Sequence, residues 1–281
     1  WNRQQAAAVL DLPPDAPLDP GQRNRIRTLG VSVFTLGQIL MEQGDPDCVA
    51  AYEEDIQYAQ RIQDTAGEAV DHYNLGHAYL TIPAIRNLDA AEAAYQRELD
   101  LLNPNDLSGR ASTTKQIGMV HHERFNESRE RDEPAETVLK HAQAAERHYH
   151  EALELRPSTD TIGVGPTHNQ LGNLYREVGQ TERAREHYEK DVQICEQTGD
   201  RYGAGQTRFN LAVMYAQAAE RESHTARRRD LFERAQAYAE AALRDFQHYQ
   251  GRAADKEAKA RRLIRDIAED LKKLDNDAEG E

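Results

Sequence analysis

Apolar residues recur along most of the chain at the spacing of an α-helix. The segment 231–246 is typical, because its apolar residues follow the i, i+3/i+4, i+7 rule and form a single stripe. Comparable segments occupy residues 91–101, 144–155 and 184–194. No segment alternates apolar and polar residues on either side of a hairpin dipeptide. The pattern therefore predicts a chain whose ordered part is almost wholly helical.

One spacing recurs four times and indicates internal repeats. An Asp is followed by a Gly three residues later, and eight residues after that comes a Leu-Gly pair or a close equivalent. We interpret each Gly as a junction between helices, and we expect it to have a positive φ or to allow a close approach of helices. A second apolar stripe follows each copy, so the repeating unit is a pair of helices, A and B. The four junctions are Asp64 with Gly67, Asp106 with Gly109, Asp160 with Gly163, and Asp200 with Gly203.

The residues within these pairs resemble the tetratricopeptide repeat, which has a Leu-Gly-x-x-Tyr element in helix A and an Ala-x-x-x-Tyr element in helix B. The fourth pair is the closest copy, with Leu171, Gly172 and Tyr175 in helix A, and Ala184 and Tyr188 in helix B. Successive helix A elements lie about 40 residues apart or more, against about 34 in the standard repeat. This spacing is similar to that of the long-repeat branch of the family, as in kinesin light chains and bacterial regulatory arrays.

The resemblance implies an all-α fold, a right-handed superhelical solenoid of about five helix pairs followed by a C-terminal capping helix. The third and fifth pairs contain extra residues, and their composition favours longer helices over loops. The basic face of the capping helix, which includes Lys256 and Lys259, either faces solvent or binds a partner. The expected divisions are a helix remnant with a Pro-rich linker (1–21), the repeat array (22–252), the capping helix (253–274) and a disordered acidic tail (275–281).

The chain departs from the family three residues after the Tyr of helix B, where the family prefers Ala. Asp55, Glu98 and Asp191 occupy this position here. An unpaired charge is costly to bury. We therefore expect these helices to pack more openly or to supply a basic partner to each acid.

Net charge and cysteine content narrow the classes of partner. With 49 Asp and Glu against 35 Lys and Arg, the chain carries a formal charge of −14, which repels nucleic-acid phosphates and anionic lipids. No segment approaches the roughly 18 apolar residues that a membrane span requires. Cys48 and Cys195 fit neither a disulfide framework nor a zinc site, which favours a cytoplasmic setting. We expect neither a nucleic-acid nor a membrane partner.

No motif for catalysis is present. None of the eleven histidines stands with a carboxylate in a zinc-ligand pattern. We expect neither cysteine to lie at a helix N-terminus or in a Gly-rich elbow, and no phosphate-binding loop occurs. We therefore expect no enzyme activity, no catalytic residue, no metal and no cofactor.

In tetratricopeptide arrays, helices A line a concave wall that binds a peptide or a helix of a partner. The resemblance assigns to this groove the polar and aromatic residues that flank the Leu-Gly elements, since an amide can both donate and accept a hydrogen bond. We expect Asn74, Asn173 and Asn210 to face a common channel, and Lys115 and Arg176 to favour an acidic ligand. The predicted groove residues are Tyr73, Asn74, His77, Lys115, Asn169, Asn173, Arg176, Phe209 and Asn210.

Two hypotheses for function follow. The first is a non-enzymatic scaffold for protein–protein interaction, with a peptide or helix bound in the groove. The alternative is a sensor segment of a larger bacterial signalling protein, either a STAND-type ATPase or a caspase-like effector, whose enzymatic domain lies outside this sequence. The start at Trp1 and the proline-rich segment 13–20 favour this alternative. The fold alone does not separate the two, and neither fixes an oligomeric state.

Overall fold

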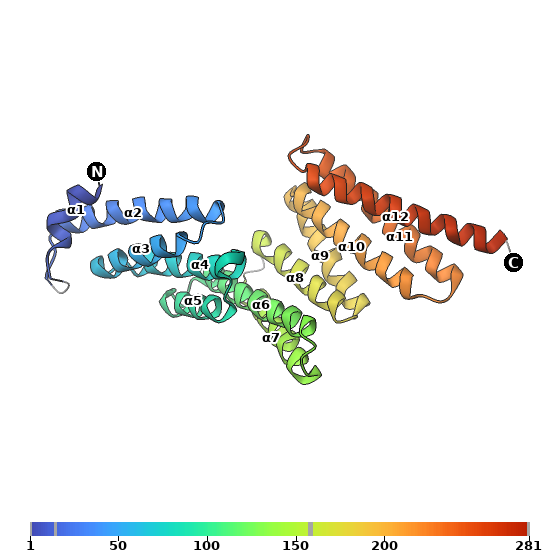
Figure 1. The fold of residues 1–281 in the computed structure, drawn as a ribbon, viewed down its shortest axis with the longest axis horizontal. Helices are drawn as coiled ribbons and strands as arrows, with labels where there is room; N and C mark the ends of the chain where they lie inside the picture. The colour runs from blue at the N-terminus through green and yellow to red at the C-terminus, as the bar shows by residue number, and fades with distance from the viewer. Residues whose placement is uncertain (1, 14–15, 157–159, 280–281) are drawn as a thin grey trace. The chain divides into compact units, whose positions relative to one another are not determined.

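The computed structural model describes residues 2–13, 16–156 and 160–279. Over these residues the chain forms twelve α-helices and one short 3-10 helix, with no strand, as the apolar pattern predicts (Figure 1). The chain divides into two compact units, residues 1–155 and 156–281, which are described separately. A continuous array over residues 22–252 stays a prediction. None of the helices in the described ranges combines the length and the apolarity that a membrane crossing requires.

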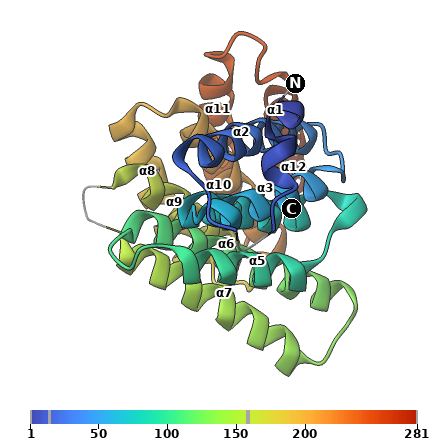
Figure 2. The same ribbon diagram turned by 90° about the vertical axis from the view of Figure 1, so that its left-hand side faces the viewer.

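The first unit contains three antiparallel helix pairs, α2 with α3, α4 with α5, and α6 with α7. Helix α1 packs on α2, and a 3-10 helix, Pro83–Ile85, joins α4 to α5. Figure 2 shows the last three helices of this unit running side by side. The bounds are α1 Asn2–Leu10, α2 Pro20–Glu42, α3 Cys48–Ile62, α4 Thr65–Thr81, α5 Leu88–Leu101, α6 Leu107–Glu130 and α7 Ala135–Leu155. Cys48 is thus the first residue of α3, so the expectation that it lies away from a helix N-terminus was wrong; its thiol is buried, and burial raises its pKa.

The second unit contains two further pairs, α8 with α9 and α10 with α11, and a last helix, α12, that packs on α11. Helices α6 and α7 have 24 and 21 residues, and α10 and α11 have 21 and 23, against 17 and 14 in α4 and α5. The bounds are α8 Thr161–Glu177, α9 Thr181–Thr198, α10 Arg201–Arg221, α11 Thr225–Gln247 and α12 Ala254–Glu279.

Helix α12 continues five residues past 274, into residues expected to form a tail. Asp275 at this end pairs with Arg229 of α11. An ion pair to a neighbouring helix favours one more helical turn where the apolar stripe has stopped. Residues 280 and 281, like Trp1 and residues 14–15 of the expected linker, lie outside the described residues.

The recurrent Asp-x-x-Gly is a helix N-cap rather than a junction with special backbone geometry. Each Asp is the N-cap of a helix A, and its carboxylate accepts a hydrogen bond from the Gly N–H, at 3.0 Å from Asp64 to Gly67 and 2.9 Å from Asp200 to Gly203. None of the four glycines has a positive φ, so the first of the two expected alternatives was wrong. The second, a close approach of helices, is found at Gly203, where an added Cβ would lie 2.9 Å from Cys195 Sγ of α9. In two of the copies a positive φ lies one residue before the Asp, at Gln63 (60°) and Gly199 (76°).

The Gly of each Leu-Gly element makes room for the Tyr of helix B. A Cβ added at Gly172 would lie 2.5 Å from the ring of Tyr188, which is closer than carbon atoms pack. In the fifth pair Ala212 replaces the Gly and Ala239 replaces the Tyr, and both are fully buried. A larger residue at the helix A position thus goes with a smaller residue at the helix B position. The other three matches are Gly37 with Tyr52, Gly76 with Tyr95, and Gly118 with Tyr149.

The three acids of helix B are not paired with bases, so the second of the two expected alternatives was wrong, and more open packing of these helices stays a prediction. In the described residues no Lys, Arg or His forms an ion pair with any of them. Instead, each faces a polar residue on helix A of the following pair: Asp55 faces Asp71, Glu98 faces Thr113, and Asp191 faces Thr207. Burial raises the pKa of Glu98 to about 7. Protonation and hydroxyl donors, rather than basic partners, therefore accommodate these acids.

Candidate functional site

A polar groove runs between α8 and α10 in the second unit. It consists of two adjoining hollows of 550 and 350 Å³, and Asn169, Gln170 and Gln206 line both. The larger hollow extends towards the start of α10 and to Tyr249. Asn210 lines the smaller one, beside the first turns of α12. We call this feature the polar groove.

Three of the predicted amides meet at the polar groove. Asn173 Oδ1 accepts hydrogen bonds from Tyr188 Oη at 2.7 Å and from Asn210 Nδ2 at 3.3 Å. Asn173 Nδ2 donates to Asn169 Oδ1 at 3.3 Å. The network joins α8 and α10, and it holds Asn169 and Asn210 in fixed orientations. The amide assignments follow from the hydrogen bonds that they allow.

A buried acid forms part of the floor of the larger hollow. Asp191 is 3% exposed and accepts hydrogen bonds from Thr207 Oγ1 and, at 3.2 Å, from Asn169 Nδ2. Burial raises the pKa of Asp191, and these donors oppose the shift. Burial and the adjacent Asp191 also raise the pKa of the Cys195 thiol, to about 12. Cys195 is therefore a protonated thiol at neutral pH, unsuited to act as a nucleophile.

Helix α12 adds a basic edge to the polar groove. Lys256 and Lys259 line the smaller hollow together with the aromatic rings of Phe209 and Phe246. They lie three residues apart, hence on one face of α12. The sequence did not decide whether this face points to solvent or binds a partner. That choice depends on the packing of α12 beside α10, which the apolar pattern does not contain.

Arg176 lies apart from the polar groove, although it was predicted with these residues. Its guanidinium pairs with Glu177 at 3.2 Å. It lines a different hollow, together with Met214 and Gln217. Its position one turn after Asn173 places it further along α8.

The remaining predicted groove residues belong to the first unit. Tyr73 Oη accepts a hydrogen bond from Gln116 at 2.8 Å, and Asn74 Nδ2 donates to the Val70 carbonyl of its own helix at 2.8 Å. Burial, with a contribution from Lys115, lowers the pKa of His77, so the ring is neutral at pH 7. A channel shared by Asn74 with the amides of the second unit stays a prediction.

The histidines of the first unit pack against one another and against acids. His121 stacks on His148 with ring centroids 5.3 Å apart, and its Nε2 lies 3.3 Å from Glu92. Burial lowers the pKa of His121 to about 4. Across the described residues, no group of three or more His, Cys, Asp or Glu side chains is arranged to hold a metal ion.

Comparison with known proteins gives a family for part of the chain. A tetratricopeptide repeat model matches residues 163–223, which span α8 to α10. No curated protein matches the sequence. Among solved structures, BtubC (BKLC) from P. vanneervenii is similar, with 14% identity, coverage of 83% of this chain and 91% of that chain, and a TM-score of 0.50. A Rap protein complexed with Competence and Sporulation Factor has 12% identity, coverage of 97% and 85%, and a TM-score of 0.48.

The family match agrees with the packing of Gly172 against Tyr188 in α8 and α9. The family match covers α8 and α10, which line the polar groove on two sides, but not Phe246, Tyr249, Lys256 and Lys259. The likeness to BtubC concerns the fold alone. Residues 163–223 therefore match the tetratricopeptide repeat, and the described residues form an all-α helical-repeat fold.

Proposed function

We propose that the chain is a non-enzymatic module for protein–protein interaction, and that its polar groove binds an extended acidic segment of a partner protein. The observation that carries this proposal is the combination of amides and lysines along one groove. Gln170, Gln206 and Asn210 offer donors and acceptors to a peptide backbone, while Asn169, whose N–H groups donate to Asp191 and Thr207, offers an acceptor. A bound backbone whose polar groups found no such partners would lose on the order of 1 kcal/mol for each missing hydrogen bond.

The preference for an acidic segment rests on local charge. Lys256 and Lys259 lie at one end of the groove, and the chain as a whole carries a charge of −14. A local basic edge on an acidic protein orients an acidic ligand towards that edge and repels it elsewhere. Phe209 and Phe246 add apolar contact beside the lysines. Binding of this kind weakens as salt is added, because salt screens exposed charges.

The test is the affinity of the full chain for short extended peptides that differ only in charge. A fluorescently labelled peptide rich in glutamate should bind, and the same peptide with lysine at each glutamate should not. We expect K256Q/K259Q to weaken binding of the glutamate peptide by roughly tenfold, which corresponds to about 1.4 kcal/mol. Asn210→Ala should weaken it further, since it removes an amide that lines the groove.

A matched control is available on the same helix. R265Q/K272Q removes two exposed charges of α12 that do not line the groove, so it should leave the affinity unchanged. Circular dichroism should confirm that every variant keeps its helical content. Equal losses in both double variants would mean that the total charge, and not the groove, governs binding. Equal affinity for the two peptides would contradict the proposal.

A further inference from the structure

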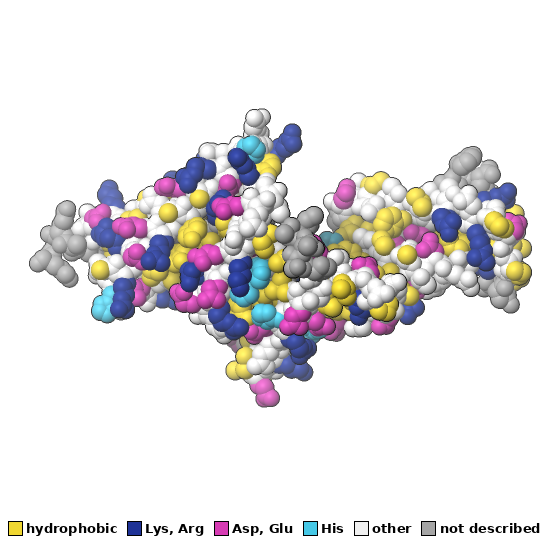
Figure 3. All heavy atoms as spheres, turned by 180° about the vertical axis from the view of Figure 1, so that it is seen from behind, with side chains coloured by type: hydrophobic (Ala, Val, Ile, Leu, Met, Phe, Trp, Pro, Cys, Tyr) yellow, Lys and Arg dark blue, Asp and Glu magenta, His cyan; other side chains and the backbone are white. Residues whose placement is uncertain are grey.

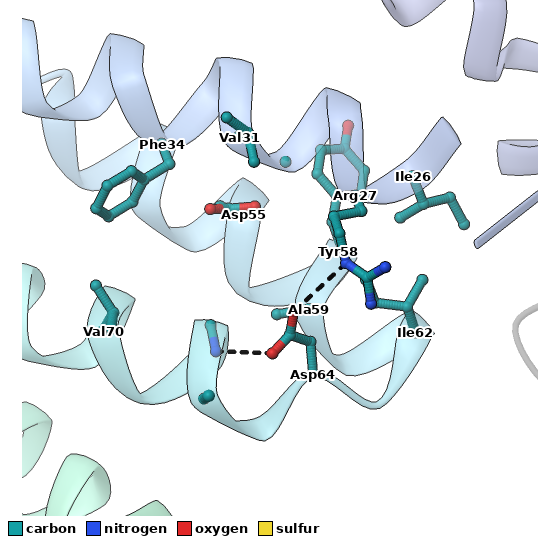
Figure 4. A pocket seen from close by; sticks show the side chains of 13 residues that line it. Ile26, Arg27, Val31, Phe34, Asp55, Tyr58, Ala59, Ile62, Asp64 and Val70 are labelled. Atoms are coloured by element: carbon teal, nitrogen blue, oxygen red, sulfur yellow. Dashed lines mark hydrogen bonds and ion pairs between the residues drawn. The ribbon is translucent and has the colours of Figure 1, made fainter. Parts of the chain in front are cut away.

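A further hollow lies in the first unit, between α2 and α4 and against α3 (Figure 4). It has a volume of 330 Å³ and a mainly apolar lining. Val31 of α2 and Val70 of α4 are 62% and 48% exposed at its walls, so apolar side chains face solvent on both sides of the hollow. Phe34 also lines it. Figure 3 shows hydrophobic side chains reaching the surface over this unit, on the right of the view. We call this hollow the apolar pocket.

One carboxylate interrupts the lining of the apolar pocket. Asp55 of α3 projects between Phe34 and Val31 on one side and Val70 on the other in Figure 4. A Cβ at Gly30 would lie only 2.4 Å from Asp55 Oδ1, so the absence of a side chain there admits the carboxylate. Burying an acid in apolar surroundings is unfavourable unless a partner compensates for the lost water.

A second acid lies behind the first. Asp71 of α4 is 1% exposed. Among the described residues, no backbone N–H, amide, base or hydroxyl group donates a hydrogen bond to either of its carboxylate oxygens. Its neighbour is the carboxyl of Asp55. Burial raises the pKa of both acids, and the charge of Asp55 helps to raise that of Asp71 to about 8. The pair therefore retains a proton at neutral pH.

No cation of the described residues neutralises this pair. Arg27 is the basic residue of the lining, and its Nε lies 3.9 Å from Asp64 at the edge of the apolar pocket, as the dashed line in Figure 4 shows. Asp64 also caps α4 through Gly67. The apolar pocket thus has a deep acidic position without a base and apolar walls that face solvent. The chemical complement is a cation on an apolar stem.

We propose that the apolar pocket binds a lysine or arginine side chain from an extended segment of a partner protein. The aliphatic stem packs against Val31, Phe34 and Val70, and the cationic head meets Asp55. A neutral apolar side chain would leave the acid pair desolvated without a partner, and a carboxylate would be repelled. The charge preference is opposite to that of the polar groove. The two sites can therefore be tested on the same protein without confusion.

The experiment uses the full chain and three peptides that differ at one residue. Each peptide has a central Lys, Gln or Glu between two leucines, and affinity is measured by isothermal titration calorimetry. We expect the Lys peptide to bind at least tenfold more tightly than the Gln peptide, and the Glu peptide to bind most weakly. The cation favours the ionised pair, so binding at pH 7 should release a proton. Titrations in buffers of different ionisation enthalpy detect that release.

Four variants separate the contributions of charge and apolar contact at the apolar pocket. Asp55→Asn keeps the shape but removes the charge, so it should abolish both the Lys over Gln preference and the proton release. Glu53→Gln removes an exposed carboxylate of the same helix that does not line the apolar pocket, and it should change neither. Val31→Ser alters an exposed residue, hence without risk to folding, and it should weaken the Lys and Gln peptides alike. K256Q/K259Q, which tests the polar groove, should have no effect here.

Several outcomes would overturn this assignment. They are the absence of binding by all three peptides, equal affinities for them, or a Lys preference that persists in Asp55→Asn. A molecular mass that rises with protein concentration and falls back in Val31→Ser would instead show that a second copy of the chain covers the apolar pocket.

Discussion

Adding one methyl group at the Gly of a Leu-Gly element tests how closely the two helices of a pair are packed. The ring of Tyr188 occupies the space that a side chain at position 172 would need. Gly172→Ala should therefore destabilise the chain by roughly 1–3 kcal/mol through overpacking, even though Ala is the better helix former. Chemical denaturation measures the change.

The fifth pair supplies the matched control for this prediction. Ala212 already carries the methyl group, opposite Ala239. In a Tyr188→Ala background, which imitates that pair, the Gly172→Ala change should cost less than it does in the native chain. A double-mutant cycle measures this coupling. Equal costs in both backgrounds would mean that the ring does not impose the glycine.

Glu98 makes stability depend on pH. Its pKa is about 7 in the folded chain, above the usual value near 4.5, so the folded state binds more protons than the unfolded state between these two values. Its contribution to stability is therefore full below about pH 4.5 and is lost as the pH rises through about 7. Glu98→Gln should remove this loss and stabilise the chain at pH 8 by roughly 2 kcal/mol.

Thermal or urea unfolding at several pH values between 4.5 and 8 tests this prediction. The comparison is the difference between the variant and the native chain, because other groups also titrate. His121 has the opposite effect on stability. Because its pKa is lowered in the folded chain, the free energy of unfolding falls as the pH falls below about 6.5. An unchanged slope in Glu98→Gln would show that Glu98 is ionised in the folded chain.

At the residue scale, the sequence shows which residues depart from the family pattern, but it does not show which residues they contact. Asp55, Glu98 and Asp191 stand out against the family pattern, but their partners lie on a different helix. Whether Glu98 faces a base or the Thr113 hydroxyl depends on how α5 packs on α6. A one-dimensional pattern does not contain that packing.

At the scale of elements, periodicity and composition predicted the helices and their order. They did not predict the role of the first glycine in each repeat. The spacing of three residues fits both a helix junction and an N-cap with its N3 residue, and the cap is what the structure has at Asp64, Asp106, Asp160 and Asp200. Gly at N3 leaves room for the capping carboxylate, which would lie 2.4 Å from a Cβ at Gly109.

The contacts of α12 were also not predictable from the sequence. Its apolar stripe was visible in the sequence, and so was its basic face. The proximity of Lys256 and Lys259 to Asn210 was not, because it depends on the angle at which α12 packs on α11. The apolar pocket was not predicted for a related reason. Val31 and Val70 lie far apart in the sequence, and only the packing of their helices brings them to one hollow.

At the scale of the whole molecule, each repeat within a unit contacts chiefly its neighbours in the chain, as in other repeat proteins. The stability of such a protein is approximately a sum over repeats and their interfaces. All residues that line the polar groove lie in the second unit, between Gly165 and Lys259. The lining of the apolar pocket lies wholly in the first unit. The two proposed sites should therefore act independently.

This independence predicts that a fragment of residues 156–281 folds alone and binds the glutamate peptide as tightly as the full chain does. The fragment is within the usual size range of a domain and keeps α8 to α12 with the core between them. A shorter fragment, 200–281, is the control: it lacks α8 and α9, so it loses Asn169, Asn173 and Asp191 and should not bind. Circular dichroism and fluorescence anisotropy on both fragments measure folding and affinity. If the longer fragment folds but binds much more weakly than the full chain, residues of the first unit contribute to the groove. The acidic segment would then contact both units, and the predicted role of Asn74 would become the next one to test.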